Sequence, residues 1–284
     1  MCVTCGCSDD AEVTVTNLEN GKVELVESHD HLHHHHHHNQ HSHTHTLADG
    51  TVVTHTHEQQ TLAATAIHSH NQTISLEQNI LAKNNLIAAQ NRGWFKGRNI
   101  LAINLMSSPG SGKTTLLTRT INDLKSQLTI SVIEGDQETT NDAKKIQDTG
   151  CKVVQINTGA GCHLDAEMID QGLQQLNPPL DSVVMIENVG NLVCPALFDL
   201  GENSKVVILS VTEGEDKPIK YPQMFRNSQV MILTKIDLLP YINFDVQKCI
   251  EYALQVNPQI QIFKLSATTG EGLDSWYKWI SDNY

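Results

Sequence analysis

The sequence has few basic residues, and they do not gather into a cluster. Lysine and arginine together number 19 among 284 residues, against 32 aspartates and glutamates, which gives a formal net charge of −13. Proteins that bind nucleic acid or an anionic membrane surface through charge carry a basic patch or stripe. The composition therefore argues against nucleic acid and membrane surfaces as the main partners.

Long apolar segments are also missing. The sequence has no run of about 18 apolar residues, the length that a membrane-spanning helix needs, so we expect no membrane insertion. The N-terminus lacks the basic stretch and apolar core of a signal peptide, and we expect a cytoplasmic protein. Because thiols stay reduced in the cytoplasm, the seven cysteines are better interpreted as metal ligands or buried thiols than as disulfides.

What the chain does contain divides it into four segments. Residues 1–8 form a cysteine-rich motif. Residues 9–72 are polar and hold every histidine except His163, and such a composition cannot bury enough apolar surface to offset its chain entropy. We therefore expect a flexible, disordered extension there. Residues 73–97 are predicted to form a helix that leads into a globular domain at residues 98–284.

The globular part has the pattern of an α/β protein. The helix expected after Thr73 has Ser75 as its N-cap and ends near Gly93. Beyond it, apolar runs without polar alternation predict buried strands, and helical patterns lie between many of them, which is typical of a mostly parallel sheet covered by helices on both faces. The predicted strands are Ile100–Met106, Ile130–Glu134, Lys152–Ile156, Ser182–Ile186, Val206–Val211, Gln229–Leu233 and Ile260–Leu265, and the predicted helices include Thr114–Gln127, Asp165–Leu176 and Val246–Val256.

A phosphate-binding loop (P-loop) follows the first of these strands. The sequence SSPGSGKTT begins at Ser107 and runs directly into a helical pattern, which is the context that a P-loop requires. Backbone amides of such a loop cradle phosphate oxygens, while Lys113 would neutralise phosphate charge and the Thr114 hydroxyl would bind Mg²⁺. Ser107 stands where the motif usually has glycine. The predicted phosphate-binding residues are Pro109, Gly110, Ser111, Gly112, Lys113, Thr114 and Thr115.

A second motif indicates the base. Thr234-Lys235-Ile236-Asp237 follows a predicted strand and is similar to the NKxD motif of GTPases, with threonine in place of asparagine. The Asp237 carboxylate can accept from N1–H and N2–H₂ of guanine, which adenine cannot offer, and the Lys235 stem can lie along the base. Ser266 and Ala267 end a later strand and would back the base. The motif predicts GTP rather than ATP.

Acidic residues at two further strand ends are candidate sensors of the γ-phosphate. Asp136 ends the sequence Glu-Gly-Asp and is a candidate for binding Mg²⁺ or orienting the attacking water. Glu187 begins Glu-Asn-Val-Gly, where it could reach Mg²⁺ while the Gly190 amide meets the γ-phosphate. Together with Lys113 they form the predicted catalytic set. The alternative is that these carboxylates cap helices or lie in solvated loops.

Two metal-binding patterns lie before the globular part. Cys2, Cys5 and Cys7 form C-x-x-C-G-C, which can place three thiolates around one soft or borderline metal ion, although a disulfide or redox pair remains an alternative. Further along, neutral imidazoles suit Ni²⁺, Cu²⁺, Zn²⁺ or Co²⁺. We interpret that tract as a natural metal buffer rather than an affinity tag. Its unbroken run, predicted to bind nickel weakly, is His33, His34, His35, His36, His37 and His38.

A third candidate metal site lies inside the globular part. Cys162 and His163 are adjacent in a loop before a predicted helix, and Cys194 follows the Glu187 element. Near such phosphate-sensing segments, two thiols and an imidazole could couple metal occupancy to nucleotide state, although a Cys-His pair is often incidental. Cys151 and Cys249 lie in apolar patterns and are predicted to be buried thiols.

Taken together, these motifs resemble the HypB family of hydrogenase nickel-incorporation GTPases. The resemblance covers residues 1–7 and about 98–284, and it is carried by MCVTCGC, NLMSSPGSGKTTLL, EGDQET, GAGCHLDA, ENVGNLVCPA, TKIDLLPY and LSATTGEGL. It implies a SIMIBI-class GTPase that forms a GTP-dependent homodimer and delivers nickel to the [NiFe]-hydrogenase large-subunit precursor with a HypA-type accessory protein. It also implies tight nickel binding by the three N-terminal cysteines, and nickel or zinc binding at Cys162, His163 and Cys194.

Two other interpretations remain open. One is a urease-type nickel GTPase, which ENVGNLVCPA and the N-terminal cysteines disfavour. The other is a nickel storage protein, in which the histidine tract is the function and the GTPase domain is regulatory.

Overall fold

The computed structural model describes residues 13–26, 42–46, 52–56, 62–137 and 141–284. The chain divides into two compact units, one made of residues 1–26 with 79–284 and the other of residues 27–78. The predicted sites at Cys2, Cys5, Cys7 and the run His33 to His38 lie outside the described residues.

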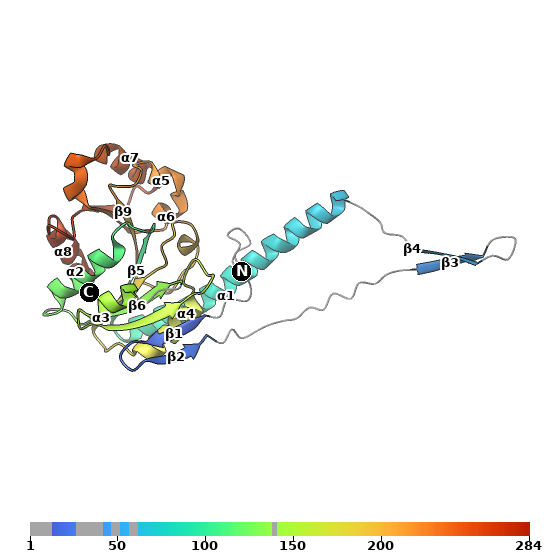
Figure 1. Ribbon diagram of the computed structural model, residues 1–284, viewed down its shortest axis with the longest axis horizontal. Helices are drawn as coiled ribbons and strands as arrows, with labels where there is room; N and C mark the ends of the chain where they lie inside the picture. The colour runs from blue at the N-terminus through green and yellow to red at the C-terminus, as the bar shows by residue number, and fades with distance from the viewer. Residues whose placement is uncertain (1–12, 27–41, 47–51, 57–61, 138–140) are drawn as a thin grey trace. The chain divides into compact units, whose positions relative to one another are not determined.

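The larger unit is built on one nine-stranded sheet with the order β11-β10-β9-β5-β8-β6-β7-β1-β2. Figure 1 labels β1, β2, β5, β6 and β9 of this sheet. The strands from β5 to β11 pair in parallel, and β1 and β2 are antiparallel additions next to β7. All seven predicted strands are present, so the predicted fold class is confirmed. The strands are β1 (Thr14–Asn17), β2 (Lys22–Leu25), β5 (Ile100–Ser107), β6 (Ile130–Asp136), β7 (Lys152–Asn157), β8 (Ser182–Glu187), β9 (Ser204–Ser210), β10 (Val230–Thr234) and β11 (Gln261–Lys264).

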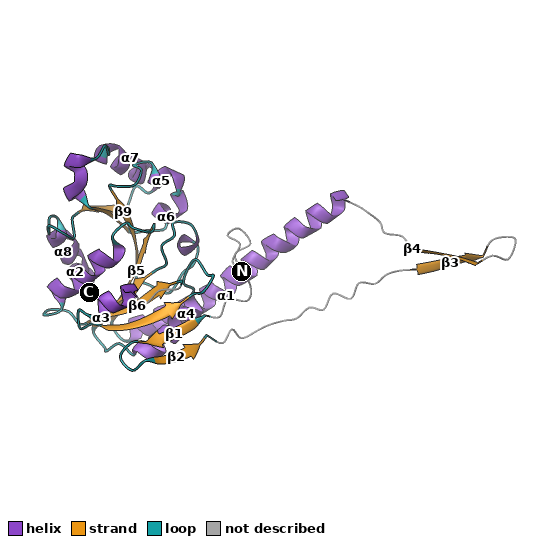
Figure 2. Ribbon diagram, in the orientation of Figure 1, coloured by secondary structure: helices purple, strands orange, loops and turns teal. Residues whose placement is uncertain are grey.

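Helices cover both faces of this sheet (Figure 2). Alternate residues of each central strand point to opposite faces, so Ile103 packs beneath α2, α3 and α8, whereas Ala102 packs beneath α1 and α4. Helices α6 and α7 cover the same face as α1, further along the sheet. The helices are α1 (Leu62–Gly97), α2 (Lys113–Leu124), α3 (Asn141–Gln147), α4 (Ala166–Leu176), α5 (Lys217–Lys220), α6 (Pro222–Arg226), α7 (Val246–Val256) and α8 (Leu273–Asn283), with 3₁₀ turns η1 (Cys194–Ala196) and η2 (Ile236–Tyr241).

The structure differs from the sequence-based expectation at residues 14–25 and in helix α1. The polar stretch after residue 9 was expected to be flexible, yet residues 14–25 form a hairpin whose first strand pairs with β7 and buries Val15 completely. Helix α1 begins at Leu62, so Ser75 lies inside it and is not its N-cap. It also continues past Gly93, because Phe95 is buried in the core, and this burial outweighs the cost of about 1 kcal/mol for glycine in a helix.

The smaller unit contains a two-stranded antiparallel sheet of β3 (Ser42–Thr46) and β4 (Val52–Thr56), in which His43 is paired with His55. This pairing lies within the histidine-rich tract, which the sequence predicted to be flexible. No described helix is long and apolar enough to cross a membrane.

The parallel strands direct the functional segments to one edge of the sheet. In parallel α/β sheets, ligands bind outside the carboxyl ends of the strands. Here β5 leads into the P-loop, β6 ends at Asp136, β8 ends at Glu187 and β10 leads into Lys235. Motifs that are far apart in the sequence are therefore brought together by strand order.

Candidate functional site

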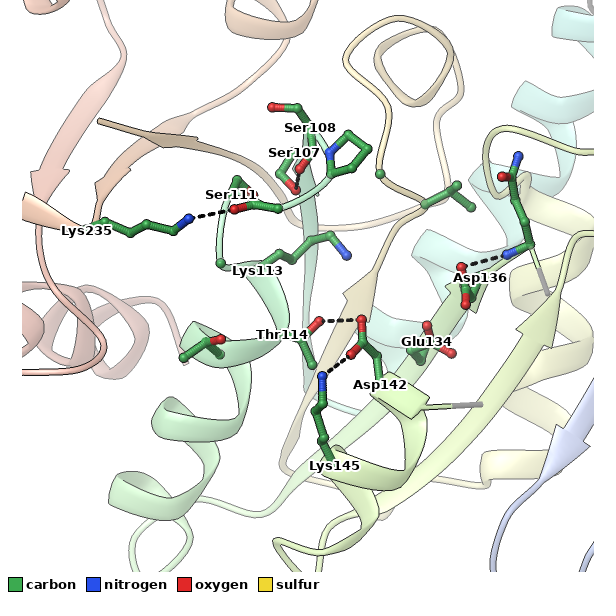
Figure 3. Close-up of a pocket in the computed structure, with 18 residues that line it drawn as sticks. Ser107, Ser108, Ser111, Lys113, Thr114, Glu134, Asp136, Asp142, Lys145 and Lys235 are labelled. Atoms are coloured by element: carbon green, nitrogen blue, oxygen red, sulfur yellow. Dashed lines mark hydrogen bonds and ion pairs between the residues drawn. The ribbon is translucent and has the colours of Figure 1, made fainter. Parts of the chain in front are cut away.

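A pocket of about 540 Å³ opens at the P-loop (Figure 3). Its walls come from the P-loop, from the segments that end β6 and follow β8, and from the start of α3. Its lining residues are Ser107, Ser108, Pro109, Gly110, Ser111, Gly112, Lys113, Thr114, Thr115, Glu134, Gly135, Asp136, Gln137, Asp142, Lys145, Val189, Gly190 and Lys235.

The P-loop backbone is shaped by two glycines. Gly110 and Gly112 have φ values of 75° and 93°, a left-handed conformation that other residues adopt only with strain. Gly112 directly precedes α2 and places no side-chain cap on it, so the first amides of the helix remain available to an anion. Ser107 is buried at the end of β5 and donates to the Ser108 carbonyl at 2.9 Å, so serine is accommodated where the motif usually has glycine.

A buried carboxylate lies against the P-loop lysine. One oxygen of Glu187, Oε1, accepts from the Lys113 ammonium and from the Thr114 hydroxyl, each at 2.6 Å. Glu134 on β6 is paired with Glu187 in the sheet register and is only 2% exposed. Burial, with Glu187 and Asp136 adding to it, raises the pKa of Glu134 to about 9.

These oxygens suit a hard divalent cation. Neither Oε2 of Glu134 nor Oε2 of Glu187 has a hydrogen-bond partner among the described residues. A buried carboxylate oxygen without a donor is costly unless a ligand satisfies it. Oxygen ligands around a phosphate site are those that Mg²⁺ prefers, so the residues present fit Mg²⁺.

Asp142, at the start of α3, was not predicted from the sequence. Its Oδ2 accepts from the Thr114 hydroxyl at 3.0 Å, and its Oδ1 accepts from Lys145 at 2.7 Å. Glu134 was also left out of the predicted site. Asp136 lines the same pocket, and its Oδ1 accepts from the Gln137 amide at 2.8 Å. In Figure 3 all three carboxylates lie on the same side of the Lys113 side chain.

A second pocket of about 240 Å³ adjoins the first, and both are lined by Gly112, Thr115 and Lys235. It holds the residues that the sequence assigned to guanine, Asp237, Ser266 and Ala267, together with Thr234, Leu238 and Thr268.

Hydrogen bonds join this second pocket to the P-loop. The Thr234 hydroxyl donates to the Ser111 carbonyl at 2.7 Å, so the threonine of this motif connects the two loops. Lys235 donates to the Gly110 carbonyl, also at 2.7 Å. On the opposite side of the P-loop, a Cβ added to Gly190 would lie 3.1 Å from Pro109, so glycine allows the segment after β8 to approach closely.

The structure also brings together the three residues of the candidate internal metal site. One ligand atom from each of Cys162, His163 and Cys194 lies within 4.8 Å of the others. The His163 ring stacks on Phe198 with centroids 3.9 Å apart, and burial lowers the pKa of His163 to about 4. The imidazole is therefore neutral at neutral pH, the form that binds metal. Two thiols and an imidazole suit nickel or zinc.

The loop that carries Cys162 and His163 is hydrogen-bonded to both phosphate-side segments. Toward Asp136, the Thr158 amide donates to the Asp136 carbonyl at 2.9 Å and Gln137 donates to the Gly161 carbonyl at 3.1 Å. Toward Glu187, the Leu164 amide donates to Asn188 at 3.2 Å, and Asn191 donates to the Cys162 carbonyl at 3.3 Å. Sequence reasoning did not single out Asn188.

The two remaining described cysteines are of a different kind. Cys249 is buried and Cys151 is partly buried. Burial raises the pKa of each thiol to about 12. Both therefore stay protonated at neutral pH, unlike the thiolates that bind metal.

The chain is similar to known proteins over most of its length. Residues 101–264 match the family model described as CobW/HypB/UreG, nucleotide-binding domain. The hydrogenase maturation factor HypB of Rhizobium leguminosarum bv. viciae is 57% identical over 212 residues, 75% of this chain and 71% of that protein. The HypB of Cupriavidus necator is 43% identical over an alignment that covers 99% of this chain and 88% of that protein.

A solved structure supports the same assignment. The crystal structure of HypB from Helicobacter pylori in complex with nickel superposes with a TM-score of 0.66 at 36% identity, covering 70% of this chain and 94% of that one. Fold, P-loop and sequence identity agree, and the chain belongs to the HypB family of hydrogenase maturation factors.

Proposed function

We propose that this protein is a GTP-hydrolysing nickel metallochaperone, in which nucleotide state controls nickel binding at Cys162, His163 and Cys194. The observation that carries this proposal is the loop of residues 158–164. Its backbone is hydrogen-bonded to the segment at Asp136 on one side and to the segment at Glu187 on the other. A ligand that moves either segment would also move two of the three metal ligands.

Guanine recognition is assigned to Asp237, with the Lys235 stem along the base and with Ser266 and Ala267 behind it. A carboxylate selects guanine by accepting two hydrogen bonds. The test is Asp237→Asn, which replaces one acceptor with a donor and so complements xanthine. We expect GTP hydrolysis to fall and XTP hydrolysis to rise in this variant, and a variant that still prefers GTP as strongly as the wild type would refute the assignment.

For hydrolysis, the P-loop amides and Lys113 hold and orient the β- and γ-phosphates, and the Gly190 amide meets the γ-phosphate. Asp136 orients the attacking water. Thr114, Asp136 and Glu187 are the residues that would hold Mg²⁺, which supplies charge neutralisation at the phosphates. If Lys113→Ala hydrolyses GTP at the normal rate, the P-loop assignment is wrong.

Nickel is proposed as the cargo rather than as a resident cofactor. Two thiols and an imidazole admit zinc as well, and the Helicobacter pylori relative was crystallised in complex with nickel. The decisive experiment is a nickel titration of the full chain with GDP and with a non-hydrolysable GTP analogue. A Cys162→Ala/His163→Ala variant that binds nickel like the wild type would remove this site from the proposal.

The proposed partners are a second copy of the chain, a HypA-type accessory protein and the [NiFe]-hydrogenase large-subunit precursor. Val193 and Leu197 flank the Cys194 turn and expose 52% and 45% of their surface, which supports a protein contact on this face. We expect the GTP analogue to double the solution mass of the wild type, and Val193→Asp/Leu197→Asp to keep it monomeric. A variant that still dimerises would contradict this contact.

A deletion separates delivery from storage. Without residues 29–70, we expect hydrogenase maturation to persist in ample nickel. Failure in ample nickel would instead make the histidine tract part of delivery.

A further inference from the structure

Asn188 is a completely buried polar residue directly after Glu187, the residue that accepts from Lys113 and Thr114. Its Oδ1 accepts from the Leu164 amide at 3.2 Å and from the Val189 amide at 3.0 Å. Leu164 follows His163 in the chain. The side chain of Asn188 therefore connects the Glu187 segment directly to the half of the metal cluster that contains Cys162 and His163.

The other end of the Asn188 side chain is linked to the segment that follows Cys194. Its Nδ2 donates to Asn104 Oδ1 at 3.2 Å, and Asn104 Nδ2 donates to Glu202 Oε1 at 3.0 Å. Asn104 is completely buried in β5, the strand that runs into the P-loop. We call Asn188, Asn104 and Glu202 the asparagine relay.

Glu202 fastens the segment between Cys194 and β9. Its Oε2 accepts from the Leu200 amide at 2.7 Å. Lys205 lies 3.7 Å from Glu202 Oε1 and donates to the Phe198 carbonyl at 2.8 Å. The Phe198 ring stacks on His163, so these contacts form a closed path that passes through His163 and through Phe198, a residue of the segment after Cys194. Asn188 is thus connected to the loop that carries Cys162 and His163, and through Asn104 and Glu202 to the segment that follows Cys194.

Burying the polar side chains of the relay costs free energy unless they form hydrogen bonds. The relay crosses a face of the sheet where Ala102, Ile186 and Leu200 are completely buried, and polar groups in such surroundings must satisfy one another. Each bond in the relay is directional, and none of its members can exchange a lost partner for water without cost. A movement of the Glu187 segment would therefore be transmitted rather than absorbed.

We propose that Asn188 is a positioning residue that transmits nucleotide state to both halves of the metal cluster, directly to the Cys162–His163 loop and through Asn104 and Glu202 to the Cys194 segment. This inference rests on the proposed function, since it explains how that coupling is achieved. No residue of the relay is a proposed ligand of metal or phosphate. A substitution can therefore break the relay without changing the ligands of either site.

The test measures the nickel dissociation constant with GDP and with a non-hydrolysable GTP analogue, and takes the ratio of the two. The protein is the full chain with Cys2, Cys5 and Cys7 replaced by serine, with free nickel set by a chelator buffer. Nickel–thiolate charge-transfer absorbance reports binding at Cys162 and Cys194. The histidine tract gives no such band, and the Cys151 and Cys249 thiols remain protonated.

The main variant is Asn104→Leu, which has a similar size but breaks the relay between Asn188 and Glu202. For coupled sites, the ratio of the two nickel dissociation constants is typically about 5–150-fold. We expect Asn104→Leu to bring this ratio closer to one by roughly threefold or more. By reciprocity, the effect of nickel on the affinity for the GTP analogue, taken relative to its effect on the affinity for GDP, shrinks by the same factor. The matched control is Thr120→Val, which removes the buried hydrogen bond from Trp276 on the opposite face of the sheet and should leave the ratio unchanged.

If Asn104→Leu does not fold, the same ratio is measured for Glu202→Gln, which keeps the side-chain shape. A wild-type ratio in the folded relay variant overturns the relay and leaves the proposed function standing. The relay is also overturned if nickel affinity changes equally in both nucleotide states, because that result indicates a structural role alone. A ratio of one in the wild type overturns the proposed function itself and the relay with it.

Discussion

The Lys113 ammonium lies 2.6 Å from Glu187 Oε1, and both side chains are largely withdrawn from solvent. Lys113 comes from the P-loop and Glu187 from the end of β8, so this ion pair joins the phosphate-binding loop to the segment that begins Glu-Asn-Val-Gly. A bound triphosphate would compete with Glu187 for the same lysine. Through this ion pair, nucleotide binding would act directly on the position of the Glu187 segment.

Replacing Glu187 with glutamine should separate nucleotide binding from hydrolysis. The variant removes a negative charge from the pocket, so we expect GTP to bind at least as tightly without Mg²⁺. Loss of a carboxylate that would hold Mg²⁺ should lower Mg²⁺-dependent hydrolysis by roughly 10–100-fold. Phosphate release over a Mg²⁺ series measures this, with the substitution of Glu251, a remote residue on α7, by glutamine as the control. An unchanged rate for E187Q would contradict the assignment.

The threonine of the guanine motif should be needed for its hydroxyl. Thr234→Val keeps the shape but removes the hydrogen bond to the buried Ser111 carbonyl, and an unsatisfied buried carbonyl costs about 1–3 kcal/mol. We expect the free energy of unfolding to fall by about that amount, and GTP binding to weaken because the guanine motif is no longer joined to the P-loop by this bond. Urea denaturation and titration with a fluorescent GTP analogue measure the two effects. Thr234→Ser keeps the hydroxyl and should bind like the wild type. Equal affinity for the valine and serine variants would show that the bond is not used.

A methyl group at Gly135 should disturb the internal metal site. Its Cβ would lie 2.8 Å from the Leu164 side chain, which follows His163, so Leu164 must shift and overpacking should cost about 1–3 kcal/mol of stability. We expect Gly135→Ala to weaken nickel–thiolate binding, and Gly135→Ala/Leu164→Ala to restore part of it. Gly93→Ala adds a methyl group where nothing lies within 4 Å and is the control. If the double variant is no better than the single one, the clash is not the cause.

Acid should loosen the contact between α2 and the guanine loop. Burial raises the pKa of Asp123, but hydrogen bonds from Arg119 and Tyr277 outweigh it and hold this pKa below its ordinary value. A lowered carboxyl pKa stabilises the fold above the unfolded pKa of about 3.9, and this stability is lost as pH falls through the folded pKa. Below the folded pKa, Asp123 is protonated and Arg119 loses this carboxylate as its partner. Arg119 also donates to the Ala267 carbonyl at 3.3 Å, so the contact with the loop at Ala267 is weakened too.

Urea unfolding between about pH 5 and pH 2 measures this effect, since that range spans the carboxyl pKa. We expect a flatter acid dependence for Asp123→Asn than for the wild type. Asp148 is exposed, and Asp148→Asn is the control for the loss of one surface carboxylate. Parallel curves for Asp123→Asn and the wild type would contradict the expectation.

The N-terminal hairpin should contribute measurably to stability. Val15 is completely buried between β7 and α4, while Val23 on the other strand is 59% exposed. Full burial of a valine side chain is worth about 1.5–3 kcal/mol, so Val15→Ala should lower the free energy of unfolding by a similar amount, measured by urea denaturation. Val23→Ala is the matched control and should change it by less than about 0.5 kcal/mol. Equal effects would mean that the hairpin is not docked on the sheet.

The local motifs were predictable because each depends on a short stretch of chain. The P-loop needs a strand, two glycines and a helix within about a dozen residues, and its sequence states all of these. The apolar runs likewise predicted the seven parallel strands. The hairpin at residues 14–25 was missed because its strands are short and polar, with a single completely buried residue, Val15, and the pairing partner β7 lies far along the chain.

Asp142, Glu134 and Asn188 belong to what only the tertiary structure decided. Asp142 meets Thr114 across 28 positions, and Asn188 meets Asn104 across 84, so neither contact leaves a local pattern in the sequence. By itself the sequence indicated which groups are candidates to bind phosphate, guanine and metal, because that depends on residue type and short spacing. Strand order and helix packing determined which groups touch, because parallel strands carry distant segments to one edge of the sheet.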